Sequence, residues 1–88
     1  MKTLFRVVAQ TEAVTINTKN GPMQKSQLVL QEEGGKYENS YIASLFGNQI
    51  KLQPGDYAWV SLSFQAREYN GTYYQDITIQ GIVPFINR

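Results

Sequence analysis

The residues best suited to binding chemistry lie around one turn, at Asn70-Gly71. Three tyrosines and one arginine fall within a few positions of this turn, namely Arg67, Tyr69, Tyr73 and Tyr74. Aromatic rings stack on flat ligands and hold cations against their faces, while a guanidinium binds anions. A solvated turn has no packing use for so many rings, so this cluster is the first candidate for a binding site.

Catalytic chemistry has few residues to work with in this chain. There is no histidine and no cysteine, which removes the commonest general base and the thiolate ligands of metal ions. The carboxylates are scattered over separate turns, at Glu12, Glu32, Glu33, Glu38, Asp56, Glu68 and Asp76. We therefore expect neither an enzyme nor a metal site, and no cofactor.

Positive charge is present but modest, because eight lysines and arginines face seven acidic residues and the net charge is +1. A protein that binds duplex DNA is expected to be strongly basic. Single strands need less charge, since each base that stacks on a ring contributes about 1–3 kcal/mol. We expect Arg6, Lys19, Lys25, Lys36 and Lys51 to contribute only as a set, because a lysine taken alone is usually a solubilising charge.

The strands on either side of Asn70-Gly71 must position this cluster, and residues 54–79 read as one long β-hairpin. Before the turn, alternate residues are apolar, at Ala58, Val60, Leu62 and Phe64. Such alternation predicts a strand with one buried face. Asn-Gly between two strand patterns predicts a type I′ turn, in which both central residues have positive φ.

Three further strands are expected before this hairpin. Residues 3–16 predict a first strand that bends where the alternation slips, at Val7-Val8. Residues 23–32 and 37–46 predict the second and third strands, with short turns at 18–22 and 33–36. Residues 47–53 are too few for a full helix and could form one or two turns at most. After the hairpin, Pro84 is expected to end the sheet because proline cannot donate to a ladder.

Five strands joined by short turns, without helical periodicity, predict an all-β fold. Their order, with one longer linkage between the third and fourth, fits a five-stranded Greek-key barrel of the OB-fold type whose helix is reduced or absent. An SH3-like barrel or a small sandwich fits the same strand count. We expect one domain over residues 1–88, with an apolar core that includes Leu28, Leu30, Leu45, Val60, Leu62, Ile77 and Ile79.

Three motifs in matching order and spacing resemble bacterial single-stranded DNA-binding proteins, the SSB family. Residues 18–21 followed by 26–30 are similar to the first hairpin of that family. Residues 44–48, with Phe46 before Gly47, resemble the end of its third strand. Residues 55–69 resemble its fourth strand, which ends in an Arg-polar-aromatic tip. The small size is also similar to that of primosomal replication proteins and of small phage single-strand binders.

The resemblance implies that Phe46 and Tyr69 stack on bases, because both match stacking aromatics of the family. The chain departs from the family at Ser40, where an aromatic is missing and Tyr41 is the neighbouring ring. The turn at 33–36 is short, so Tyr37 can only loosely replace another stacking ring. With the residues above, the candidate nucleic-acid-binding set contains Phe46, Tyr69, Tyr73, Tyr74, Tyr37, Tyr41, Arg67, Lys19, Lys25 and Arg6.

Structural interpretations of these rings remain open at the level of sequence. Phe46 could be a core residue at the end of its strand, although Leu45 has the opposite parity and is the better core candidate. Tyr69 and Tyr73 could form a cross-strand pair that only stabilises the hairpin. Arg67 could form a weak surface ion pair with a neighbouring carboxylate.

A second surface is indicated by Trp59, which lies on the outer parity of its strand between Tyr57 and Ser61. An exposed Trp is more typical of a subunit interface than of a base platform, and the alternative is a lone surface ring. We therefore expect Trp59 and Tyr57 to lie in the interface of a homodimer or homotetramer.

The function predicted from these residues is binding of single-stranded DNA, or RNA, without sequence preference, in replication, recombination or repair. The alternative is an OB-fold module for protein interaction or assembly that binds no nucleic acid. The two differ in whether Phe46, Tyr69 and Tyr37 point toward one open face. No stretch is long and apolar enough to cross a membrane, and the N-terminus reads as a strand rather than a signal peptide. We expect a cytoplasmic protein without a membrane partner, encoded by a bacterial cell, a plasmid or a phage.

Overall fold

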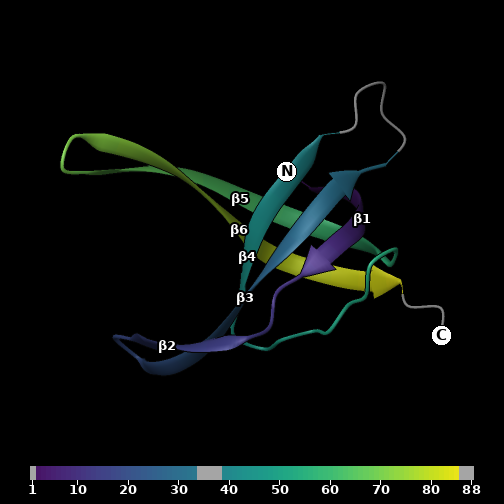
Figure 1. Cartoon of the computed structure of the whole chain (residues 1–88), viewed down its shortest axis with the longest axis horizontal. Coiled ribbons are helices and arrows are strands. Elements are labelled where there is room, and N and C mark those ends of the chain that lie inside the picture. The colour runs from purple at the N-terminus through teal and green to yellow at the C-terminus, as the bar shows by residue number, and fades with distance from the viewer. Residues whose placement is uncertain (1, 34–38, 86–88) are drawn as a thin grey trace.

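The computed structural model describes residues 2–33 and 39–85, and these residues form an all-β structure (Figure 1). The strands are β1 (Lys2–Gln10), β2 (Val14–Thr18), β3 (Gly21–Glu32), β4 (Ser40–Phe46), β5 (Tyr57–Tyr69) and β6 (Thr72–Phe85). Within the described ranges there is no helix, and so none that could span a membrane. The predicted all-β class is confirmed.

The six strands form one sheet that closes on itself into a barrel. Hydrogen-bonded neighbours follow the order β1-β5-β6-β4-β3-β2, and β1 also pairs with β3. The ring is joined between β4 and β6 by a short parallel pairing, at Ser44 and Thr78, while the other described pairings are antiparallel. Because β4 lies beside β6 rather than β5, residues 47–56 must cross the open end of the barrel to reach β5.

The first predicted strand is divided in two, which gives six strands rather than five. β1 ends at Gln10, and at the break Thr11 replaces a ladder partner: its amide donates to the Gln27 carbonyl, and its hydroxyl accepts from the Gln27 amide. Beyond the break, β2 pairs with β3. The register against β3 shifts between Val7 and Ala9, which confirms the bend predicted there.

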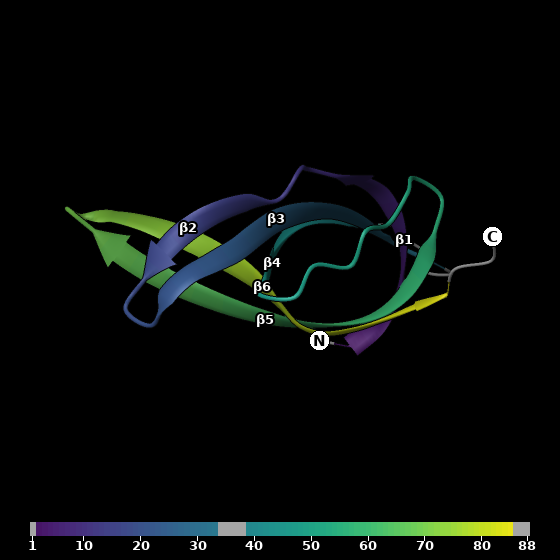
Figure 2. The same ribbon diagram turned by 90° about the horizontal axis from the view of Figure 1, so that it is seen from below.

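Two hairpin arms project from the same end of the barrel, as both views show (Figures 1 and 2). The upper arm in Figure 1 is the distal part of β5 and β6, and the lower arm is β2 with the first half of β3. Asn70 and Gly71 have φ values of 51° and 79°, so the predicted turn with positive φ at both central residues is confirmed. In the lower turn, Gly21 has a φ of 105° and Thr18 Oγ1 accepts from the Asn20 amide.

The core contains most of the predicted residues and several others. Leu28, Leu30, Leu45, Val60, Leu62 and Ile79 are buried, and Ile77 is partly buried against them. Buried apolar residues outside that list are Phe5, Val7, Ala43, Leu52 and Ala58, and Ser26 is a buried polar residue. Phe64 keeps the predicted parity and packs edge-on against Tyr41, but its ring is 42% exposed because β5 leaves the barrel after Leu62. Pro84 lies within β6, which ends one residue later.

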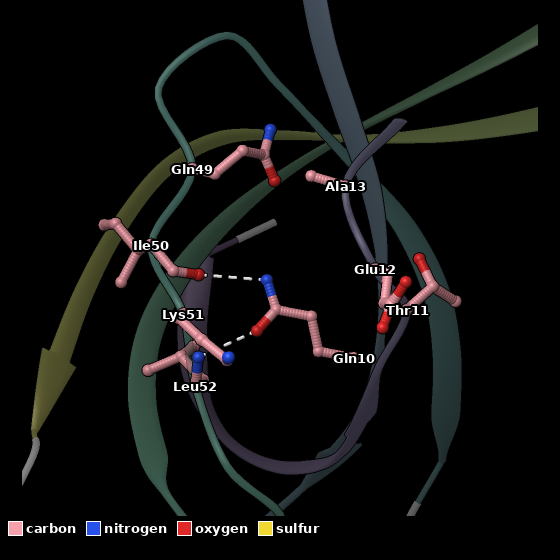
Figure 3. Close-up of a pocket in the computed structure, with 8 residues that line it drawn as sticks. All are labelled: Gln10, Thr11, Glu12, Ala13, Gln49, Ile50, Lys51 and Leu52. Atoms are coloured by element: carbon pink, nitrogen blue, oxygen red, sulfur yellow. Dashed lines mark hydrogen bonds between the residues drawn. The ribbon is translucent and has the colours of Figure 1, made fainter. Parts of the chain in front are cut away.

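The linkage between β4 and β5 contains no helical turn, and the side chain of Gln10 holds it in place (Figure 3). Gln10 Nε2 donates to the Ile50 carbonyl at 2.9 Å, and Gln10 Oε1 accepts from the Leu52 amide at 2.7 Å. One side-chain amide thus pairs with residues i and i+2 of an extended segment, as a neighbouring strand would. This contact sets Leu52 into the open end of the barrel, where its side chain is 4% exposed.

Candidate nucleic-acid interface

The outer face of β3 and β4 forms the floor of a groove next to the upper arm. Because Ser26, Leu28, Ala43 and Leu45 point into the core, the intervening residues face outward. Register places Lys25 opposite Phe46, Gln27 opposite Ser44, and Val29 opposite Ile42. The groove has a volume of about 380 Å³ and is lined by Lys25, Gln27, Ile42, Ser44, Phe46, Gln65, Gln75, Asp76, Ile77 and Thr78.

Phe46 and Lys25 form the first charged and aromatic pair of this groove. The Phe46 ring is 39% exposed, whereas its neighbour Leu45 is buried, so the outward parity expected for Phe46 is what the strand shows. Lys25 Nζ lies 5.5 Å from the centroid of the Phe46 ring, within the range of a cation–π contact. A cation therefore lies beside an exposed π-face on the strand end that the sequence singled out.

Arg67 and Tyr74 form the second such pair, on the upper arm. Arg67 Cζ lies 4.8 Å from the Tyr74 ring centroid, and Arg67 Nε lies 2.7 Å from Asp76 Oδ2. Register pairs Arg67 with Tyr74 and Gln65 with Asp76 on the same face of the hairpin. Since Asp76 and Gln65 also line the groove, the second pair directly continues its wall.

Tyr69 and Lys19 mark the tips of the two arms. Tyr69 is the last residue of β5, shares the face of Arg67 by alternation, and is 65% exposed. Lys19 lies in the turn between β2 and β3 and is exposed. These two positions form the outer rim of the same end of the molecule, beyond the groove itself.

Two tyrosines of the candidate set lie elsewhere. Tyr73 is 75% exposed but pairs with Glu68, on the face of the arm opposite Arg67. Tyr41 points toward the core, where its ring packs edge-on against Phe5 and Phe64, each with centroids 5.9 Å away. Its hydroxyl donates to Glu32 Oε1 at 3.1 Å, and desolvation, followed by this hydrogen bond, raises the pKa of Tyr41.

Arg6 also lies away from the groove, beside β3 and β5. Its guanidinium donates to the Gln31 side chain, and its Nε lies 3.4 Å from Glu33 Oε1. It borders a shallow hollow with Val8 and the Pro54-Gly55 turn. Tyr37, the remaining member of the candidate set, lies outside the described residues.

Polar residues outside the predicted set make up much of the groove, namely Gln27, Ser44, Gln65, Gln75, Asp76 and Thr78. Their amide, hydroxyl and carboxylate groups could hydrogen-bond base edges or sugars. Outward alternation along the second and third predicted strands was a usable signal for Gln27 and Ser44. The same alternation places Gln65, Asp76 and Thr78 outward, but it could not place them beside β4, because that approach depends on the parallel contact of β6 with β4.

Comparison with known proteins identifies the fold. No protein-family model matches the chain, and no curated protein is significantly similar to it in sequence. Among solved structures, it is similar to the second OB-fold domain of replication protein A from Methanococcus maripaludis, with a TM-score of 0.72 and 22% sequence identity. The match covers 99% of this chain and 84% of that domain. The predicted OB-fold barrel with its helix absent from the described linkage is therefore confirmed.

Proposed function

We propose that this protein binds single-stranded nucleic acid in the groove on β3 and β4, with DNA as the primary ligand and RNA as the alternative. The observation that carries the proposal is the groove itself, flanked by the Lys25–Phe46 and Arg67–Tyr74 pairs. Single-strand binders combine rings for base stacking with cations for phosphates. OB-folds bind oligonucleotides on this face, between the first hairpin loop and the loop of the last hairpin.

Two further considerations support the same proposal. The structural neighbour is a domain of a replication protein, in keeping with a role in replication, recombination or repair. The net charge of +1 favours a ligand that is bound largely through its bases, because a duplex exposes mainly phosphates. The resemblance to bacterial single-stranded DNA-binding proteins at Phe46 and Tyr69 points to stacking as the main source of affinity.

The proposal is tested by fluorescence anisotropy with a short labelled oligo(dT), long enough to fill one groove, at low salt. Phe46→Ala should weaken binding by about 1–3 kcal/mol, or roughly 5- to 150-fold, because it removes one stacking platform. Phe85→Ala is the matched control, since Phe85 is also an exposed strand phenylalanine but lies on β6 away from the groove lining. Duplex DNA should compete poorly.

Two results would contradict this assignment. No binding by the wild-type protein at low salt would discard nucleic acid as the ligand and favour an interaction module. Equal binding by wild type and Phe46→Ala would retain the ligand but place the stacking platform elsewhere. Repeating the titration with oligo(U) decides between DNA and RNA.

A further inference from the structure

A second exposed surface lies at the opposite end of β5 and β6 from the arms, on the outside of the barrel. Cross-strand register aligns Leu4, Trp59 and Val83 in one row over β1, β5 and β6. The next row contains Arg6, Tyr57 and Phe85. We call the five apolar members of these rows the apolar sheet face: Leu4, Tyr57, Trp59, Val83 and Phe85.

The apolar sheet face is large for a protein of this size. Tyr57, Trp59 and Phe85 are 41%, 40% and 54% exposed, and Val83 is 58% exposed. The full accessible surface of an aromatic side chain is about 150–250 Å², so at these exposed fractions the three rings alone expose roughly 200–350 Å². With Val83 this is comparable to the largest apolar patch of a typical monomer, about 300–600 Å², which often has a function.

Gly81 gives this face a flat floor beside Trp59. It pairs with Ser61 in the row adjoining Trp59 and Val83, directly after the register shift of β6 at Gln80. A Cβ at position 81 would meet nothing within 4 Å, and the backbone does not have the positive φ that favours glycine. Neither packing nor backbone geometry within one chain therefore requires glycine here, whereas close approach of a second molecule would.

We propose that the apolar sheet face is covered by a second copy of this chain, in a two-fold symmetric dimer. A two-fold interface needs a self-complementary surface, and this face offers both a projecting ring, Trp59, and a flat receiving area, Ser61 and Gly81. Trp59 of each copy would lie over Ser61 and Gly81 of the other.

Area and charge both favour this occupant. A standard interface buries about 800 Å² on each partner and is about 56–65% apolar, so a patch of this size supplies much of the apolar part. The only charged side chain in the two rows, Arg6, is already paired with Gln31 and Glu33. The net charge of +1 means that two copies repel each other only weakly.

The arrangement would leave both grooves free. Arg67 lies eight positions after Trp59 on β5, and a strand rises about 3.3 Å per residue, so the two lie about 26 Å apart along the strand. If the proposed function holds, a dimer would present two grooves to one long strand and gain avidity. The dimer itself does not depend on that function, because its test contains no nucleic acid.

The test is sedimentation equilibrium of the whole chain without nucleic acid, together with Trp59 emission followed on dilution. Trp59 is the sole tryptophan in the sequence, so its fluorescence reports the face directly. We expect a dimer at high micromolar concentration and a red shift of emission as dilution separates the copies. Gly81→Val and Trp59→Lys should each raise the dimer dissociation constant at least tenfold. Tyr73→Lys is the control, because Tyr73 is a more exposed ring on the far arm.

Thermal melting separates loss of the dimer from loss of the fold. Gly81→Val adds its side chain into open space and should keep the monomer folded. A wild-type monomer at high micromolar concentration would overturn the proposal. A dimer that both variants leave unchanged would overturn it too, because the contact would then use another surface. A dimer weakened equally by Tyr73→Lys would also count against this face.

Discussion

At the scale of single residues, the two cation–π pairs are weak enough to open when a ligand arrives. Lys25 and Phe46 are partly exposed, and such pairs contribute about 0.5–1 kcal/mol at exposed sites. A base that stacks on the same ring contributes about 1–3 kcal/mol. In the proposed complex, stacking on Phe46 would therefore outweigh the resting contact, and the displaced Lys25 ammonium would be available to a phosphate.

Asp76 is the one acidic side chain in the groove lining, and its removal should strengthen binding. Its carboxylate holds Arg67 at 2.7 Å and repels phosphates that approach the arm. In Asp76→Asn the arginine is free to pair with the nucleic acid, so we expect affinity for oligo(dT) to rise roughly two- to fivefold. Anisotropy titration at low and moderate salt measures the change.

The controls for this prediction separate charge from fold. Arg67 and Asp76 side chains are 57% and 45% exposed, so the pair adds little to stability and Asp76→Asn should shift the unfolding free energy by no more than about 0.5 kcal/mol. Arg67→Ala should weaken binding and flatten the salt dependence by about 0.7 in the logarithmic slope. Weaker binding by Asp76→Asn would mean that the carboxylate contacts a base instead of opposing the phosphates.

The sequence could assign single residues to the core or the surface only through their parity along a strand. Neighbouring residues of a strand face opposite sides, so parity correctly placed Leu45 inward and Phe46 outward. It could not reveal that Tyr41 fills the space between Phe5 and Phe64, since that packing joins three strands distant in sequence. The ion pair of Arg6 with Glu33 was hidden for the same reason.

At the scale of elements, the linkage from β4 to β5 shows how a barrel end is closed without a helix. Leu52 is buried in that end, with Ile50 packed against the core. Gln10 pairs with the backbone at both residues, and Gln49 Nε2 donates to the carbonyls of Leu45 and Gly47. Two glutamine side chains thus supply hydrogen bonds that a helix would make within itself.

Removing the Gln10 amide should therefore loosen the closed end of the barrel. Gln10→Leu keeps the approximate volume but leaves the Ile50 carbonyl and the Leu52 amide without this partner. An unsatisfied buried group costs about 1–3 kcal/mol. For a domain of this size that corresponds to a fall in Tm of roughly 5–20 °C. Urea and thermal unfolding followed by circular dichroism measure the loss.

Gln53→Leu is the matched control, because Gln53 lies on the same linkage with its side chain exposed. It should change the unfolding free energy by no more than about 0.5 kcal/mol. Equal stability of Gln10→Leu and the wild type would show that Leu52 stays in place by apolar contact alone. Oligonucleotide binding should be preserved in both variants, since neither residue lines the groove.

The elements themselves were largely predictable, and the exceptions have a common cause. Local chemistry specified the Asn70-Gly71 turn, the turn at 18–22 and the bend at Val7-Val8. The break at Thr11 was missed because its hydroxyl and amide bond to Gln27, sixteen residues away. The Gln10 side chain bonds to the linkage at residues 40 and 42 positions away in the sequence. No local sequence pattern predicts a contact at that separation.

At the scale of the whole molecule, one strand serves both the barrel and an arm. Alternation in β5 predicts a buried face as far as Phe64, but burial stops at Leu62. From Phe64 to Tyr69 every residue of β5 is exposed, and the hairpin extends past the barrel (Figure 2). Pattern alone cannot locate this boundary, because it depends on where the neighbouring strands end.

That boundary predicts opposite outcomes for two equivalent substitutions on the same strand. Leu62 and Ala66 have the same parity, yet Leu62 is 2% exposed and Ala66 is exposed. Leu62→Asp would bury an unpaired charge in a domain whose total stability is about 5–15 kcal/mol, and it should unfold the protein. Ala66→Asp should keep the native circular dichroism and a Tm close to that of the wild type. If both variants unfold, the arm is part of the cooperative core; if both fold, Leu62 is not the inward residue that defines the barrel.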